Sequence, residues 1–302
     1  MARQPEGPPP PPVVQRLRLR YAKRGRLRFT SHRDFARAFE RALRRAEVPM
    51  GYSAGFSPHP KISYHGAAPT GVASEAEYLE IGLAVSMDPE AVRAALDACL
   101  PPGLDIEECV PAGAGTLADR IDASRWRIFL PGLDAATVDA AVTAFLAAET
   151  IPVERLTKNG RRTIDARAAV VSMASAEAIT QTAAAAVTQA AAAAVSAEDR
   201  GRCAILDVVV RQVSPAVRPD DVIAALAAVA ACVPTAPARA TRLAQGRLDD
   251  SGQLTDPLAP DGAAALAARE SSPDTIESID KSTQFDGVDR VDTVDRIDTA
   301  ER

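Results

Sequence analysis

The sequence lacks any apolar run that approaches the roughly 20 residues a membrane-spanning helix needs. Its first residues, Met-Ala-Arg-Gln-Pro, also lack the apolar core of a signal peptide. We therefore expect a soluble cytoplasmic protein that has no membrane partner. With 302 residues, the chain is long enough for about two domain-sized units.

Cysteine is scarce, and the four cysteines stand singly at positions 99, 109, 203 and 232. Zinc and iron–sulfur sites usually draw on closely spaced cysteine pairs, so neither kind of site is expected. A close-spaced histidine motif such as His-Glu-x-x-His is also absent from the sequence. The sequence thus predicts no disulfide, no cysteine-bound metal and no cofactor.

Acidic residues are few near the amino terminus and abundant at the other end. Residues 13–65 hold thirteen basic and three acidic side chains, whereas residues 249–302 hold five basic and fourteen acidic ones. The net charge of the whole chain, −5, hides this opposition. Because the acidic stretch has little apolar content, we predict a disordered tail over residues 249–302, and a disordered proline-rich leader over residues 1–12.

Between these ends the hydrophobic pattern repeats once. Each copy is ordered strand, helix, strand, strand, helix, strand, which is the order of the split βαβ unit in ferredoxin-like folds. We predict an α+β protein of two ferredoxin-like halves packed together, one over residues 13–112 and the other over residues 122–248. An alanine-rich stretch, residues 174–197, interrupts the second copy as an inserted loop or a helix of marginal stability.

A helix is predicted after Ser31, its expected N-cap, from the apolar stripe that begins at Phe35. Arginines follow one another along this helix at a spacing of four, with one more beside them: Arg33, Arg37, Arg41, Arg45 and Arg44. Like charges at this spacing repel by a few tenths of a kcal/mol per pair, a cost that an anionic partner would turn into binding energy. The alternative is a solvated arginine-rich face. The preceding strand adds further arginines to the expected basic surface, namely Arg16, Arg18 and Arg20.

All three histidines fall in this basic stretch. His32 opens the predicted helix, His59 lies in a loop with two flanking prolines, and His65 shares a strand face with Lys61. These imidazoles are candidates for general acid–base chemistry on a phosphodiester. They are also candidates for a metal site with carboxylates from Asp34, Glu75 or Glu77. The ordinary alternative is that they cap, hydrogen-bond or stack.

Four segments carry a family resemblance: Leu27–Arg37, Arg41–Ala46, Gly55–Ser63 and Gly71–Tyr78. Two more match further along the chain, Gly160–Arg167 and Val217–Val222. Together these segments resemble the signature of the radical-SAM-linked protein family, and the likeness extends over about residues 13–248.

This resemblance implies a domain of unknown function that occurs alone or joined to radical SAM enzymes with a cobalamin-binding-type region. The cluster motif Cys-x-x-x-Cys-x-x-Cys is absent here, so this chain cannot itself hold that cluster. It would act beside such an enzyme or independently. In outline the predicted fold is also similar to RAMP-type RNA-processing endoribonucleases, which is an analogy at the level of the fold.

Three functions stay open. The first is an accessory module that binds RNA and presents it to a radical SAM enzyme or to RNA-processing machinery, through Arg28, Ser31, Arg33, Arg37, Arg41, Arg44, Arg45, Lys61 and His65. The second is a metal-independent ribonuclease-like or other phosphoryl-transfer enzyme, with His32 and His59 as acid and base. The third is a protein scaffold whose partner interface includes Phe56 and Tyr64.

Overall fold

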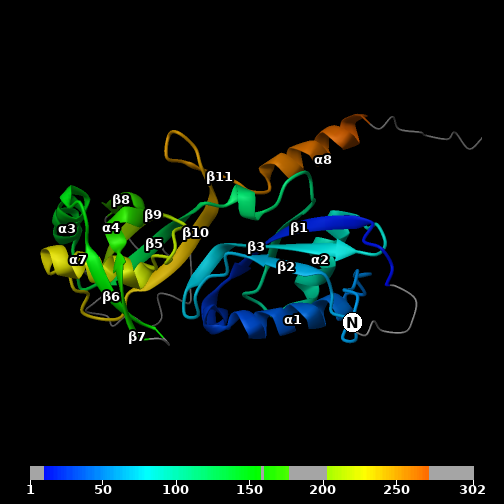
Figure 1. Ribbon diagram of the computed structural model, residues 1–302, viewed down its shortest axis with the longest axis horizontal. Helices are drawn as coiled ribbons and strands as arrows, with labels where there is room; N and C mark the ends of the chain where they lie inside the picture. The colour runs from blue at the N-terminus through cyan, green and yellow to red at the C-terminus, as the bar shows by residue number, and fades with distance from the viewer. Residues whose placement is uncertain (1–9, 158–159, 177–202, 272–302) are drawn as a thin grey trace, which may run out of the picture.

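The computed structural model of the protein describes residues 10–157, 160–176 and 203–271 (Figure 1). The strands are β1 (Gln15–Lys23), β2 (Ile62–His65), β3 (Ala73–Leu83), β4 (Ile106–Pro111), β5 (Ala123–Pro131), β6 (Pro152–Thr157), β7 (Gly160–Asp165), β8 (Val170–Ala176), β9 (Cys203–Arg211), β10 (Arg239–Leu248) and β11 (Leu254–Thr255). The helices are η1 (Gly25–Phe29), α1 (His32–Arg45), α2 (Pro89–Cys99), η2 (Ala118–Arg120), α3 (Ala135–Ala147), α4 (Ala166–Ala169), α7 (Pro219–Ala230) and α8 (Ala259–Ser271).

One large mixed sheet runs through the described part of the chain. Its strands follow the order β4-β1-β3-β10-β5-β9-β8, with β2 beside β3 and β11 beside β10. Strands β6 and β7 form a separate hairpin. The predicted α+β class is therefore confirmed. The predicted element order also occurs twice, first as β1, α1, β2, β3, α2, β4 and then as β5, α3, β8, β9, α7, β10 with a hairpin and a short helix inserted.

In the first half, α1 and α2 pack against the same face of the sheet. Alternate residues of β1 point to these helices because successive side chains of a strand face opposite ways. They form one core with apolar residues of both helices, including Leu17, Leu19, Phe35, Leu43 and Leu96. The ring of Tyr21 stacks on that of Phe35, with 4.2 Å between the ring centroids.

The second half is built in the same manner. Helices α3 and α7 lie together at one end of the molecule (Figure 1) and contribute Phe145 and Leu226 to a second core with Ile128 of β5. Asp134 caps α3, since its carboxylate accepts a hydrogen bond from the backbone N–H of Thr137 at 2.8 Å. This capping follows the preference of helix starts for short polar side chains.

A short helix separates β7 from β8. The Asp165 carboxylate accepts hydrogen bonds from the backbone N–H groups of Ile151 and Arg167, at 2.9 and 3.0 Å. These bonds turn the chain into the short helix α4 before β8 begins at Val170. The hairpin of β6 and β7 is thus set apart from the strand that joins the large sheet.

The two halves meet where β10 pairs with β3. The pairing is parallel and brief, joining Thr241 to Ala73 and Arg242 to Ser74. The rest of this edge of β3, from Tyr78 to Ile81, is occupied by the antiparallel strand β2. Each half therefore supplies a strand to one continuous sheet, and only a short ladder crosses between them.

The prediction of a disordered tail over residues 249–302 is wrong for its first part. Residues 249–271 form a turn, β11 and α8. The start of α8 contacts the sheet face opposite α1, and the helix extends away from it (Figure 1). Leu258 is fully buried there in a cluster with Tyr78 and Leu117. The apolar side chain of Leu258 and the buried carboxylate of Asp261 explain why this polar stretch folds. Residues 272–302, residues 1–9 and the alanine-rich stretch beyond residue 176 lie outside the described residues.

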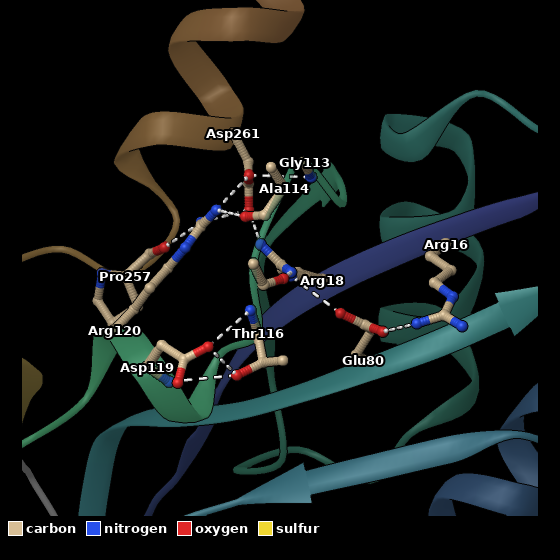
Figure 2. A network of polar contacts seen from close by, with 11 residues as sticks. Arg16, Arg18, Glu80, Gly113, Ala114, Thr116, Asp119, Arg120, Pro257 and Asp261 are labelled. Carbon is tan, nitrogen blue, oxygen red and sulfur yellow. Dashed lines mark hydrogen bonds and ion pairs between the residues drawn. The ribbon is translucent and has the colours of Figure 1, made fainter.

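A buried carboxylate fastens α8 to the sheet. Asp261 is 2 % exposed, and its oxygens accept hydrogen bonds from the guanidinium groups of Arg18 and Arg120, both at 2.8 Å, and from the Gly113 N–H at 3.0 Å. Figure 2 shows these donors converging on the carboxylate from three segments of the chain.

Among the described residues, no helix is long and apolar enough to cross a membrane.

The substitution Asp261→Asn should lower the free energy of unfolding at pH 7 by about 3–5 kcal/mol, because it leaves the buried Arg18 without one of its countercharges. Burial opposes ionisation of Asp261, but the hydrogen bonds from Arg120 and Arg18 outweigh it and lower its pKa below the ordinary value of 3.8. The stabilisation is therefore complete above pH 3.8 and is lost as the pH falls through the lower pKa of the folded protein.

Urea unfolding of wild type and variant at a series of pH values measures this difference. We expect the deficit of Asp261→Asn to narrow as the solution becomes more acidic than pH 3.8. The matched control is Asp250→Asn, which changes an exposed carboxylate eleven positions before. Equal unfolding midpoints for the two variants at pH 7 would show that Asp261 does not fasten α8.

Candidate functional site

Helix α1 begins as its sequence predicts. The Ser31 hydroxyl accepts a hydrogen bond from the backbone N–H of Asp34 at 3.2 Å and donates one to the Asp34 carboxylate at 2.7 Å. Phe35 and Phe39 are buried on the core side of the helix. The predicted capping role of Ser31 is therefore confirmed, and its contact with an anion stays a prediction. The cap and the buried stripe together fix which side of α1 faces water.

Five arginines gather on that outer side, and we call them the α1 arginine face: Arg33, Arg37, Arg41, Arg44 and Arg45. All five are exposed. Among the described residues, the ion pair recorded for this set joins Arg37 to Asp34 at 3.9 Å, with both side chains more than half exposed. Exposed pairs of this kind contribute little stability. The positive charge of α1 is thus left almost entirely to solvent.

The arginines of β1 behave differently, and the expected continuous basic surface is wrong in this respect. They point to the opposite face of the sheet, where carboxylates neutralise them. Arg16 pairs with Glu80 at 3.2 Å, Arg18 pairs with the same carboxylate at 2.9 Å, and Arg20 pairs with Glu108 at 3.3 Å. Figure 2 shows Glu80 between Arg16 and Arg18. Alternation along β1 separates these cations from those of α1.

The three histidines do not form one pocket. His32 lies at the start of α1, and its ring packs edge-on against the Tyr64 ring, with 4.8 Å between the ring centroids. His65 follows Tyr64 on β2 and therefore faces the other side of the sheet, where its charged neighbours are Glu80 and Arg18. Burial, opposed by Glu80, lowers the pKa of His65. The expectation that His65 shares the surface of α1 is thus wrong.

His59 has a local role in the loop between α1 and β2. Its backbone N–H donates to the Ser53 hydroxyl at 3.1 Å, and its Nδ1 lies 2.9 Å from that same oxygen. Lys61 is exposed close by, at the base of the same loop. Within the described residues, no recorded contact joins His59 to His32. The proposed acid and base are therefore not brought together by any recorded contact.

Two aromatic residues beside α1 differ in accessibility. The Arg28 guanidinium lies over the ring of Phe29, 4.5 Å from its centroid, and that ring is 59 % exposed. Tyr64 is instead half-buried between His32 and Phe35, and burial raises the pKa of its hydroxyl. Phe56, in the loop that holds His59, is also exposed. Of the two residues that the scaffold hypothesis names, Tyr64 is therefore less accessible to a partner than Phe56.

Buried polar and charged residues lie where β10 pairs with β3, and we call them the seam cluster: Lys23, Ser74, Glu77 and Arg242. The Arg242 guanidinium donates to Glu77 and to the Ser74 hydroxyl, so it crosses from β10 to β3. The Lys23 ammonium donates to the carbonyls of Ala68 and Pro69 at 3.3 and 3.4 Å. All four members are less than one-tenth exposed.

The seam cluster was not recognised from the sequence, although one signal was present. Glu77 lies two residues before Leu79 and four before Ile81, so it falls on the apolar face of β3. A carboxylate in such a position needs a partner charge. The partner could not be named because Arg242 lies 165 residues further along the chain.

The described residues contain no group of three or more histidine, cysteine, aspartate or glutamate side chains that could hold a metal ion. The four cysteines are free thiols. Cys109 is buried, and burial raises its pKa to about 12. The chemistry that the site offers is therefore that of guanidinium, imidazole and aromatic groups.

A family described as an uncharacterized protein conserved in bacteria (DUF2344) matches residues 16–219. The matched part contains all of α1 and ends at the first residue of α7, so β10 and α8 lie beyond it. Nothing in the match connects the family to radical SAM enzymes. No curated protein matches the chain.

The substitution Glu77→Gln should destabilise the protein by about 3–5 kcal/mol, because it leaves the buried charge of Arg242 unpaired where the two halves meet. Chemical denaturation measures the effect. Glu149→Gln, which neutralises an exposed carboxylate after α3, is the control and should change the free energy of unfolding by less than about 0.5 kcal/mol. Similar stabilities of the two variants would mean that the seam cluster contributes nothing to joining the halves.

Proposed function

The chain belongs to this family of uncharacterized bacterial proteins, and we propose that it binds RNA or another phosphate-rich ligand on the α1 arginine face. One observation carries the proposal. The arginines of β1 all have carboxylate partners, whereas those of α1 are exposed with a single long ion pair recorded among the described residues. A polyanion would supply the missing negative charge.

The energetics of α1 support this assignment. Neighbouring arginines four residues apart repel one another, and each such pair weakens an isolated helix by a few tenths of a kcal/mol. The buried stripe and the Ser31 cap hold the helix together despite this repulsion. Phosphate oxygens accept the planar, bidentate hydrogen bonds that guanidinium groups donate. Binding would therefore relieve the repulsion and add charge-assisted hydrogen bonds.

The resemblance to the radical-SAM-linked family supports a second part of the proposal. In it, the chain is an accessory module that holds its ligand for a separate modifying enzyme, either a radical SAM enzyme or part of an RNA-processing machinery. We also propose that each half is a ferredoxin-like unit. The strand orders β4-β1-β3-β2 and β10-β5-β9-β8, each with two helices packed on the sheet, support that assignment.

The alternative functions find less support. A ribonuclease that uses His32 and His59 as acid and base needs both imidazoles near one phosphate. His59 is hydrogen-bonded inside its own loop, whereas His32 contacts Tyr64. The scaffold hypothesis names Tyr64, whose ring packs against Phe35 of α1. Binding is therefore the function that the geometry supports best.

The double variant Arg37→Gln/Arg41→Gln tests the binding function. Titration of a fluorescein-labelled RNA 20-mer, followed by anisotropy between 50 and 200 mM salt, should show weaker binding by the variant at every salt concentration. The slope of log affinity against log salt should become shallower by roughly 1.4, since each lost phosphate contact on a single strand changes it by about 0.7.

The matched control is Arg162→Gln/Arg211→Gln, which removes two exposed arginines from the second half. It lowers the net charge by the same amount but leaves α1 intact. We expect its affinity and salt slope to stay close to those of wild type. An equal loss in both double variants would assign the binding to overall charge rather than to α1. No binding by wild type at 50 mM salt would refute the function.

A further inference from the structure

We propose that the α1 arginine face takes single-stranded RNA, and that Phe29, Arg28 and His32 form a stacking platform for its unpaired bases. This inference rests on the proposed function and adds the substrate class to it. The platform lies at the amino-terminal end of the arginine face, where η1 leads into α1. The platform gives a role to the exposed ring of Phe29, which is not part of a hydrophobic core.

The exposure of Phe29 is the first observation. Its ring is 59 % exposed, whereas Phe35 and Phe39, which follow it within ten residues, are 2 % and 0 % exposed. Burying a phenylalanine is ordinarily favourable, so this ring gives up stability by staying in solvent. Arg28 and exposed His32 flank it in the sequence, and both carry planar groups on which bases stack.

The rigidity of the platform is the second observation. The backbone carbonyl of Arg28 accepts a hydrogen bond from Gly71 N–H at 2.8 Å, which ties η1 to the loop of residues 66–72. Gly71 has a positive φ of 93°, a conformation that favours glycine. The loop is held from below by the seam cluster, because Lys23 donates to its carbonyls and Glu77 accepts from Ala68 N–H at 3.0 Å.

A ring held in this way is preorganised, so little conformational entropy is lost when a base stacks on it. The seam cluster and the exposed Phe29 ring are thus connected through the loop of residues 66–72. Their arrangement gives the seam cluster a role in presenting the ligand site as well as in joining the halves. The cation–π contact with Arg28 further limits the rotation of the ring.

The position of the platform relative to the charges points to a single strand. Arg33 lies four residues after Phe29, and the arginine face continues along α1 at about 1.5 Å per residue to Arg45. A strand whose phosphates follow these arginines can place its bases on the rings at the helix start. Duplex RNA keeps the faces of its bases inside the stack, where the rings cannot reach them. Positive charge combined with exposed rings is typical of single-strand binding.

The substitution Phe29→Ala tests the platform in the full-length protein. Wild type should bind a labelled single-stranded 20-mer of uridine and adenosine more tightly than a hairpin duplex of equal charge. Phe29→Ala should weaken binding of the single strand about tenfold and should leave binding of the duplex nearly unchanged. Its salt slope should match that of wild type, because the ring carries no charge. Leu156→Ala, at an exposed apolar residue of β6, is the control and should change neither affinity.

The variant Phe29→Trp provides a second readout that does not depend on loss of function. An indole at this position should retain the preference for the single strand, and its emission should be quenched when bases stack on it. Wild type, whose single tryptophan is the buried Trp126, should show no such quenching.

The two proposals fail in different ways. Equal affinities for single strand and duplex, together with unchanged binding by Phe29→Ala and unquenched Phe29→Trp, would overturn the stacking platform. If Arg37→Gln/Arg41→Gln still weakened RNA binding in that case, the proposed function would stand without it. Absence of RNA binding by every form of the protein at 50 mM salt would overturn both.

Discussion

A charged side chain can leave water at small cost only where an opposite charge or hydrogen-bonding groups receive it, and the joint between the two halves depends on this constraint. Only two residue pairs link β3 to β10 through the backbone. The Arg242 guanidinium reinforces that short ladder by reaching Glu77 and Ser74 from the other half. Lys23 adds a second positive charge near Glu77 and holds the neighbouring loop. The continuity of the sheet thus relies on a compact set of mutually compensating charges.

The same constraint sorts the arginines of the first half into two groups. On the strand side, Glu80, Glu108 and Asp261 neutralise the guanidinium groups of β1. On the helix side, the arginines are exposed to solvent, and the ion pair recorded for them in the described part of the chain joins Arg37 to Asp34. The arginines of the first half therefore have two different roles. Some of them are structural, and the others form an exposed positive surface on which the proposed ligand would bind.

Local signals in the sequence were sufficient for much of the fold. The cap at Ser31 and the spacing of apolar residues located α1 because both depend on residues a few positions apart. The class and the repeated order of elements follow from these local patterns.

What the sequence could not provide were partners distant along the chain. The basic row of β1 looked available because its carboxylates come from β3, β4 and α8. His65 was grouped with His32 because both lie in the basic stretch of the sequence. In the structure Tyr64 faces α1, and His65, the next residue of the same strand, therefore faces the other side of the sheet. The tail was expected to be unstructured from its composition, yet Leu258 and Asp261 anchor its first part. Each error concerns contacts between residues that lie far apart along the chain.

The great separation of the paired charges bears on how the protein is made. Asp261 is synthesised 243 residues after Arg18, and Arg242 follows Glu77 by 165 residues. The amino-terminal half emerges from the ribosome first, and such a domain generally folds as a unit during synthesis. Here that unit emerges with Arg18 and Glu77 each lacking one of the partner charges that it has in the complete fold, so these groups stay hydrated. The nascent half therefore keeps one sheet edge and one sheet face open until translation is nearly complete, and β10 and α8 close them last.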